Sequence, residues 1–322
     1  MSSLIYTWEN ADFMPSDTAP SIHRTDDVLA AGLRWRVRRQ GSGPTLLLLH
    51  GTGASAASWQ AVADRLGDRF SVLMPDLPGH GGSQAWADGR ATLPRMAEAL
   101  AALLAELKFE PQIVAGHSAG AALMLQWALH SAPCPAQALM AVNGALQPLR
   151  GLPGLVFPVI ARLLRHSAWL PSVVARHASQ PAAVRRLIAG TGSKLDEAAV
   201  AQYQSLLMQP SHVAGALDMM ANWQIDEMLA ALPRLQLPLW LVTGTADRTV
   251  APQQSRDWAR RLPVAQLREL PGLGHLAHEE APGRVAGLID ALWRQRAPVG
   301  AADTAADTAA KTAAESACGS AT

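Results

Sequence analysis

The chain carries a serine, an aspartate and a histidine in three short motifs that suit nucleophilic catalysis. Ser118 lies in Gly-His-Ser-Ala-Gly, Asp247 ends Thr-Gly-Thr-Ala-Asp, and His275 ends Gly-Leu-Gly-His. A serine hydroxyl is a weak nucleophile near neutral pH, so it needs an adjacent base that is oriented by a third group. The three motifs therefore predict a nucleophile at Ser118, a base at His275 and an acid at Asp247, in the chain order Ser, Asp, His.

The surroundings of Ser118 predict a sharp turn between a strand and a helix. Residues 112–115 form a short run that is mostly apolar, and residues 121–130 have a helical pattern. Small residues flank the serine because such a turn brings the strand and the helix close together. Acyl transfer also needs two N–H donors for the developing oxyanion. We expect them from Ala119, which follows the nucleophile, and from Thr52 in the sequence His-Gly-Thr-Gly.

Other residues compete for the roles of base and acid. His278 is a second candidate base, and either histidine could be held by the neighbouring Glu279 and Glu280. Asn143 occupies the other usual position of the acid, but an amide cannot supply the negative charge that stabilises an imidazolium. The remaining candidate acids are weaker because they lie in a different part of the chain: Asp218 and Asp226.

The elements around these motifs alternate between strands and helices. Short apolar runs end in turns or polar residues, and helical segments separate them. This alternation predicts an α/β fold with a mostly parallel central sheet flanked by helices. The expected strands begin near Leu33 and continue at residues 45–49, 70–74, 112–115, 138–142, 238–243 and 266–270; helices are expected at 93–107, 119–130 and 253–262.

Composition divides the chain into four parts. Residues 1–30 lack a clear period and are predicted to be an N-terminal extension. Residues 31–145 and 234–296 are predicted to form the α/β core, and the mostly helical residues 146–233 an inserted cap. Residues 297–322 repeat Ala, Asp and Thr without large apolar side chains, so we expect a disordered tail.

The overall charge, the cysteines and the absence of certain motifs bear on the partners, the compartment and the cofactors to be expected. The net charge of +1 gives no argument for nucleic-acid binding. Cys134 and Cys318 are not expected to form a disulfide, and residues 1–12 do not resemble a signal peptide, so we expect a cytoplasmic protein. No metal-ligand spacing, Walker A loop or dinucleotide-binding motif occurs, so we expect neither a metal nor a cofactor.

With these motifs in hand, the chain resembles the α/β-hydrolase superfamily from about residue 33 to residue 296, and within it the BchO family. The resemblance rests on Gly-His-Ser-Ala-Gly-Ala, on residues 50–55, 142–146 and 272–280, and most specifically on residues 212–217 with Met-Met-Ala-Asn-Trp at 219–223. That family comprises accessory proteins of magnesium chelatase in bacteriochlorophyll biosynthesis. The resemblance implies a role near magnesium insertion into a tetrapyrrole, with magnesium chelatase as a partner, and does not identify a bond that is cleaved.

The predicted cap combines basic and apolar residues. No Asp or Glu occurs from Pro111 to Leu195, whereas the second half of this stretch carries several cations, including Arg162 and Arg165. One interpretation is that the cap receives a flat apolar molecule with carboxylates, such as a porphyrin, or rests on an anionic membrane surface. The other is a solvated basic face on ordinary helices. The residues expected to line the substrate pocket are Gly51, His117, Asn143, Trp223, Arg162 and Arg165.

The favoured interpretation is a serine hydrolase that cleaves an ester or a related carbonyl compound through an acyl-enzyme. Two alternatives stay open. The same residues could serve a cofactor-free C–C hydrolase or a perhydrolase. The chain could also be a tetrapyrrole-binding accessory protein that retains a hydrolase fold without turnover. Ser118 differs from the aspartate nucleophile of the related epoxide hydrolases and haloalkane dehalogenases, which disfavours those two activities.

Overall fold

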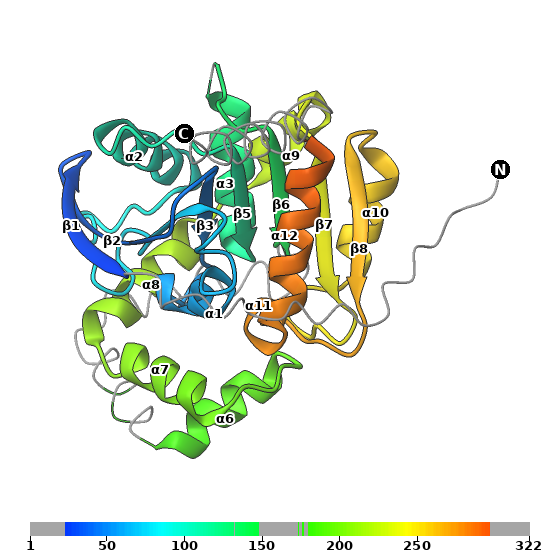
Figure 1. The fold of residues 1–322 in the computed structure, drawn as a ribbon. Coiled ribbons are helices and arrows are strands. Elements are labelled where there is room, and N and C mark those ends of the chain that lie inside the picture. Colours follow the sequence, from blue (N-terminus) through cyan, green and yellow to red (C-terminus); the bar gives the residue numbers. More distant parts are fainter. Residues whose placement is uncertain (1–22, 132, 148–172, 174–175, 177–179, 297–322) are drawn as a thin grey trace, which may run out of the picture.

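The computed structural model describes residues 23–131, 133–147, 173, 176 and 180–296, and these form an eight-stranded, mostly parallel sheet covered by helices (Figure 1). The strand order is β1-β2-β4-β3-β5-β6-β7-β8. The pairings β1–β2 and β2–β4 are antiparallel, and all others are parallel. The strands are β1 Arg24–Ala30, β2 Leu33–Gln40, β3 Thr45–Leu49, β4 Ser71–Pro75, β5 Ile113–His117, β6 Ala138–Val142, β7 Leu239–Gly244 and β8 Ala265–Leu270.

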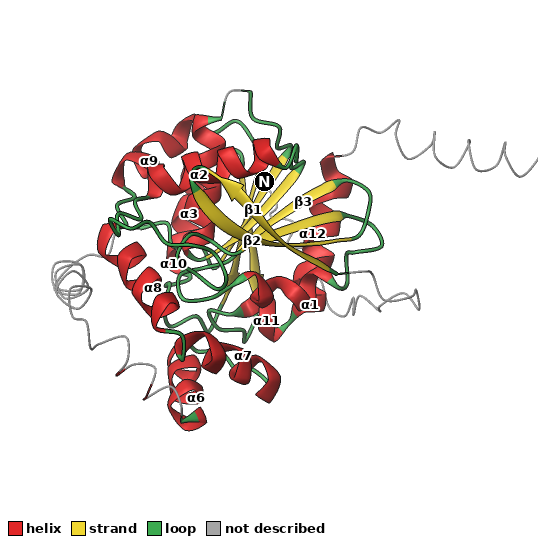
Figure 2. Cartoon of the chain, turned by 90° about the vertical axis from the view of Figure 1, so that its left-hand side faces the viewer, coloured by secondary structure: helices red, strands yellow, loops and turns green. Residues whose placement is uncertain are grey.

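The central strands are buried on both faces, which explains their continuous apolar runs. In β3, Leu47 and Leu49 point into one core cluster, while Leu46 and Leu48 point into the other. Figure 2 shows α2, α3 and α10 on one face of the sheet and α1 and α12 on the opposite face. The helices that cover the two faces are α1 Gln60–Ala63, α2 Leu93–Glu106, α3 Ala119–His130, α10 Gln253–Arg261, α11 Ala277–Glu280 and α12 Pro282–Arg296.

The predicted fold class is confirmed, and the edge strand β1 was missed. Residues 24–30 were assigned to an N-terminal extension, yet they pair with β2 from Arg24↔Arg39 to Ala30↔Leu33. The tight turn at Ala31 and Gly32 has positive φ at both residues, as a two-residue hairpin requires. Because β1 lies at the sheet edge and is mostly exposed, it lacks the apolar pattern of the inner strands. Residues 1–22 of the predicted extension and the predicted tail lie outside the described residues.

Helices α6–α9, here called the inserted helices, lie between β6 and β7 in the sequence. They are α6 Pro181–Gly190, α7 Glu197–Leu207, α8 Pro210–Asn222 and α9 Asp226–Ala231. In Figure 1, α6 and α7 lie beyond the carboxyl ends of the central strands. Since the loops that carry the chemical motifs also leave the sheet at these ends, the inserted helices are placed to contact them. No helix in the described part of the chain is long and apolar enough to cross a membrane.

Candidate active site

Ser118 lies on a strained turn between β5 and α3. Its backbone has φ 52° and ψ −116°, a conformation that non-glycine residues rarely adopt. The turn is tight because a Cβ atom on Gly116 would collide with the carbonyl of Gly120, and one on Gly120 would collide with the carbonyl of Leu49. This geometry matches the nucleophile turn expected from the sequence and leaves the serine partly exposed, at the start of the helix.

Ser118, His275 and Asp247 form one continuous chain of hydrogen bonds. The Nε2 atom of His275 lies 3.1 Å from Ser118 Oγ, and its Nδ1 atom lies 2.8 Å from Asp247 Oδ2. Asp247 follows β7 and His275 follows β8, so neighbouring strands bring the two loops together. His275 and Asp247 are both buried. The arrangement allows the imidazole to accept the serine proton while the carboxylate holds the ring.

Backbone and side-chain donors fix the carboxylate of Asp247. The N–H groups of Thr249 and Val250 donate to Oδ1 at 2.7 and 2.9 Å. The Nδ2 atom of Asn143 donates to Oδ2 at 2.7 Å, the same oxygen that faces His275. Asn143 was expected to line the substrate pocket, but it is fully buried behind Asp247 and supports the carboxylate instead.

The structure also separates His275 from its rival His278. His278 is completely buried, and neither of its ring nitrogens has a hydrogen-bond partner among the described residues. Burial lowers the pKa of His278 to about 3. Its ring packs in a tilted arrangement against those of Trp59 and His117, with centroids 4.4 and 4.3 Å away. His278 is therefore a packing residue, and His275 is the histidine that reaches Ser118.

Neither Glu279 nor Glu280 holds the base. Glu279 accepts a hydrogen bond from the hydroxyl of Tyr203 at 2.6 Å, and burial raises its pKa to about 8. Glu280 accepts the backbone N–H groups of Gly274 and Lys194 at 2.8 and 3.0 Å. Both glutamates thus connect the segment around His275 to the inserted helices.

The two expected oxyanion donors belong to segments that adjoin Ser118. Ala119 follows it in the chain, and a Cβ atom on Gly51, the residue before Thr52, would lie 3.0 Å from Ser118 Cβ. Ala119 is the first residue of α3, and Thr52 lies in the loop after β3. Neither N–H donates a hydrogen bond to another described residue. The hydroxyl of Thr52 points to α8, where it donates to Met219 Sδ at 3.2 Å. Both N–H groups are therefore without a partner among the described residues, as an oxyanion site at this position would require.

The other residues expected to line the substrate pocket lie in different surroundings. His117 is buried behind the base, where its Nε2 donates to the carbonyl of His275 at 2.9 Å, so it supports the base loop. Gly51 lies close enough to His117 that a Cβ atom would contact the ring at 2.9 Å. Trp223 directly follows α8 and packs half-buried against the larger core cluster. Arg162 and Arg165 lie outside the described residues.

The described cations of the acid-free stretch are partly neutralised. Arg185 forms an ion pair with Glu197, with 2.6 Å between Nη2 and Oε2. Both side chains are exposed, and Glu197 lies just beyond the stretch that lacks acidic residues. The positive charge of α6 is therefore smaller than its sequence alone suggests.

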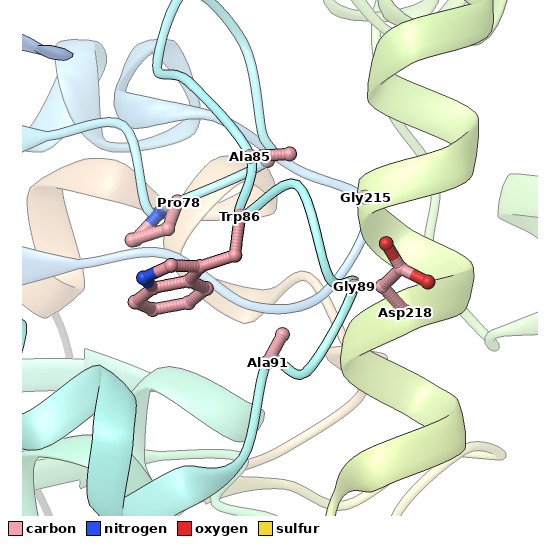
Figure 3. Close-up of a pocket in the computed structure, with 8 residues that line it drawn as sticks. Pro78, Ala85, Trp86, Gly89, Ala91, Gly215 and Asp218 are labelled. Atoms are coloured by element: carbon pink, nitrogen blue, oxygen red, sulfur yellow. The ribbon is translucent and has the colours of Figure 1, made fainter. Parts of the chain in front are cut away.

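A small cavity lies between the 78–91 segment and α8 (Figure 3). It is a shallow hollow lined by Pro78, Gly79, Ala85, Trp86, Gly89, Ala91, Gly215 and Asp218. It encloses almost no space, whereas pockets for drug-sized ligands occupy roughly 300–1,000 Å³, and none of the lining residues belongs to the Ser118 group. Asp218 therefore belongs to this separate region, and Asp226 lies exposed at the start of α9. No cluster of metal-ligating side chains occurs among the described residues.

The loop between α6 and α7 contacts both catalytic loops. The carbonyl of Thr191 accepts the N–H groups of Arg248 at 3.1 Å and of His275 at 3.3 Å. The N–H of Leu276 donates to Ser193 Oγ at 2.8 Å. One carbonyl from the inserted segment thus joins the loop of the acid to the loop of the base.

Comparison with known proteins gives two kinds of match. A family model described as alpha/beta hydrolase fold matches residues 44–282. The chain is 42% identical over 247 residues to the magnesium-chelatase 30 kDa subunit of Rhodobacter capsulatus, covering 77% of this chain and 86% of that protein. It is 29% identical over 288 residues to a 2-hydroxymuconate semialdehyde hydrolase of Pseudomonas putida, covering 84% and 94%.

Solved structures agree with the fold. A thermophilic esterase from Thermogutta terrifontis superposes with a TM-score of 0.70 at 23% identity, covering 85% of this chain and all of that one.

Proposed function

The chain belongs to the α/β-hydrolase fold family and to the family of the magnesium-chelatase 30 kDa subunit, and from this premise we propose that it is a serine hydrolase of bacteriochlorophyll synthesis. The observation that carries the proposal is the unbroken hydrogen-bond chain from Ser118 through His275 to Asp247. The substrate is an ester or a related carbonyl compound, and a tetrapyrrole ester fits the relationship to the chelatase subunit.

The first half of the reaction forms an acyl-enzyme. The Ser118 oxygen attacks the substrate carbonyl while His275 Nε2 accepts the hydroxyl proton. The N–H groups of Thr52 and Ala119 stabilise the negative oxygen of the tetrahedral intermediate. When the intermediate collapses, the bond to the alcohol breaks, and the imidazolium donates its proton to the leaving oxygen.

The second half releases the acid. His275 removes a proton from water, whose oxygen attacks the acyl carbon and forms a second tetrahedral intermediate. Collapse of this intermediate breaks the bond to Ser118, and the serine oxygen recovers its proton from His275. Asp247 stabilises the imidazolium in both halves, and three donated N–H groups hold its carboxylate in place.

Labelling with a fluorophosphonate probe tests this proposal. We expect the wild-type protein to be labelled on Ser118, located by peptide mass spectrometry, and the Ser118→Ala variant to lose the label. Ser131→Ala, at the other end of α3, is the matched control and should label like the wild type. A wild-type protein that does not react, or a label that survives Ser118→Ala, would contradict a serine hydrolase.

A second candidate function is a non-catalytic accessory role, with contact to magnesium chelatase and binding of a tetrapyrrole. The relationship to a protein named as a chelatase subunit favours it. The same Ser118→Ala variant separates the two candidates in cells that lack the wild-type protein. Full pigment synthesis with Ser118→Ala supports the accessory role, whereas loss of pigment with a stably folded variant supports turnover.

The similarity to a 2-hydroxymuconate semialdehyde hydrolase favours hydrolysis of a C–C bond as an alternative activity of the same residues. Assaying the wild-type protein with a 2-hydroxymuconate semialdehyde and with p-nitrophenyl acetate distinguishes the two bond types. Turnover of the ester alone supports the proposed substrate class.

A further inference from the structure

Two buried imidazoles hold the loop that carries Thr52 from either side. His50 accepts the N–H of Leu77 on Nε2 at 2.9 Å, so its proton lies on Nδ1 and is donated to the carbonyl of Gly51 at 2.8 Å. A neutral imidazole can accept on one nitrogen and donate on the other, as this arrangement requires. Burial lowers the pKa of His50 to about 4, which keeps the ring neutral near pH 7.

His212 repeats this pattern from the inserted helix α8. It accepts the N–H of Gly81 on Nδ1 at 3.0 Å, so its Nε2 proton is donated to the carbonyl of Gly53 at 3.1 Å. Its ring is buried and lies edge-on to that of His80, with centroids 5.3 Å apart. His50 and His212 therefore bind the carbonyls on the two sides of Thr52.

These carbonyls control the direction of the Thr52 N–H because peptide units are planar. The Gly51 carbonyl and the Thr52 N–H belong to one peptide unit, and so do the Gly53 carbonyl and the Ala54 N–H. The Ala54 N–H in turn donates to the Gly51 carbonyl at 3.2 Å. Fixing the carbonyl of Gly53 thus fixes the Ala54 N–H, then the Gly51 peptide unit, and with it the donor at Thr52.

Helix α8 contacts this loop a second time. Met219, seven residues after His212 and two helical turns along the same face, accepts the hydroxyl proton of Thr52 at 3.2 Å. We propose that His212 is a positioning residue for the oxyanion site, so that docking of α8 aligns the Thr52 N–H. This inference rests on the proposed function, since it concerns how the intermediate of that reaction is stabilised.

A pair of substitutions isolates the contact to Gly53. His212→Gln carries an amide N–H at a reach close to that of Nε2, so it keeps a donor for the Gly53 carbonyl. His212→Asn keeps an acceptor for the Gly81 N–H but is too short to donate to Gly53. Asn222→Ala is the matched control, because Asn222 also ties α8 to the core, through the carbonyl of Gly89 at 3.0 Å, without contacting the Thr52 loop.

The experiment compares p-nitrophenyl acetate with its thionoester, in which sulfur replaces the carbonyl oxygen and is a poor acceptor for the N–H donors. We expect His212→Asn to lower kcat for the oxygen ester roughly 10- to 100-fold with an unchanged KM, and to lower the oxygen-to-sulfur rate ratio by a similar factor. A trifluoromethyl ketone should bind correspondingly more weakly. His212→Gln and Asn222→Ala should stay within about threefold of the wild type.

The outcomes separate this inference from the proposed function. A wild-type protein that neither turns over the ester nor reacts with a fluorophosphonate would contradict the function itself. An active wild type with an unchanged oxygen-to-sulfur ratio in His212→Asn would overturn the positioning role alone. If His212→Asn does not fold, His212→Gln still decides, because a large fall of the ratio in a variant that keeps the donor to Gly53 contradicts the proposal.

Discussion

At the scale of single residues, Asn143 is the side chain that most changes the picture of the site. It follows β6 directly, has a left-handed φ of 48°, and places Nδ2 2.7 Å from the carboxylate oxygen that faces His275. Its amide also lies 3.3 Å from the carbonyl of Gly274. An asparagine that lacks the charge needed for the acid thus positions the carboxylate that we propose for this role.

This proximity predicts that the acid can be moved from β7 to β6. Asp247→Asn should lower kcat for p-nitrophenyl acetate by about 10⁴-fold, since the imidazolium loses its negative partner. Adding Asn143→Asp places a new carboxylate close to the position of the lost one, near His275. We expect kcat of the double variant to be at least about tenfold higher than that of Asp247→Asn. Steady-state kinetics of the two variants check this. A double variant no faster than Asp247→Asn would show that position 143 serves Asp247 only as a hydrogen-bond donor.

The sequence predicted much of this local chemistry because the motifs are short and contiguous. Ser118, its strained turn, and the neighbouring Ala119 follow from one pentapeptide between a strand and a helix. His275 was preferred as the base, and His278 stayed a rival because only two residues of chain separate them. The hydrogen bond of His275 to Ser118 and the packing of His278 against Trp59 and His117 distinguish the two. The support from Asn143 was missed because it depends on two strand ends 104 residues apart.

At the scale of elements, the loop between α6 and α7 joins the inserted helices to the acid and base loops. Gly192 has a φ of +85°, and a Cβ atom there would collide with the carbonyl of Ala246, next to Asp247. Thr191 on one side accepts the N–H of His275, and Ser193 on the other accepts that of Leu276. The loop can approach so closely only because the middle residue lacks a side chain.

We therefore expect Gly192→Ala to reduce both stability and activity. The positive φ and the collision together should lower the free energy of unfolding by about 2–4 kcal/mol, and kcat should fall because the acid and base loops separate. Urea unfolding and ester kinetics measure the two effects. Gly190→Ala, two residues earlier at the end of α6, meets nothing within 4 Å and should leave kcat unchanged. Equal kinetics for the two variants would contradict a role for this loop in alignment.

The elements differ in how well the sequence predicted them. Inner strands such as β3 and β6 were placed correctly because burial on both faces requires an apolar run. β1 was missed because an exposed edge strand needs no such run; the Ala31-Gly32 turn before β2 was the available signal. The contacts of His212 and Thr191 with the catalytic loops could not be predicted, since they join segments that are distant in sequence.

At the scale of the whole molecule, buried neutral histidines couple stability to pH. Burial lowers the pKa values of His50 and His278 to about 4 and about 3, and it also lowers those of His80, His117 and His212. Below pH 6.5 the unfolded chain takes up protons that the folded chain does not bind. The free energy of unfolding should therefore be greatest above pH 6.5 and fall as the pH drops toward 4, by up to about 1.4 kcal/mol per pH unit for each histidine.

Urea unfolding at pH 7, 6 and 5 measures this dependence. His278→Leu removes a buried imidazole that has no hydrogen-bond partner among the described residues, so it should flatten the curve by about one proton. Gly190→Ala, which changes no titratable side chain and meets no atom within 4 Å, is the control and should leave the slope unchanged. Equal stability of the wild type at pH 5 and pH 7 would contradict the burial of neutral imidazoles.

The carbonyl of Thr191, which accepts the N–H groups of both Arg248 and His275, also bears on how such proteins diversify. Exchanging the inserted helices between relatives would transfer more than the surface that meets the substrate, because the same segment sets the spacing between the acid and base loops. A chimaera must therefore carry the donor's residues at the facing positions 246 and 274 of the core as well as the donor helices. In this architecture a change of the inserted helices is therefore expected to alter substrate preference and catalytic activity together.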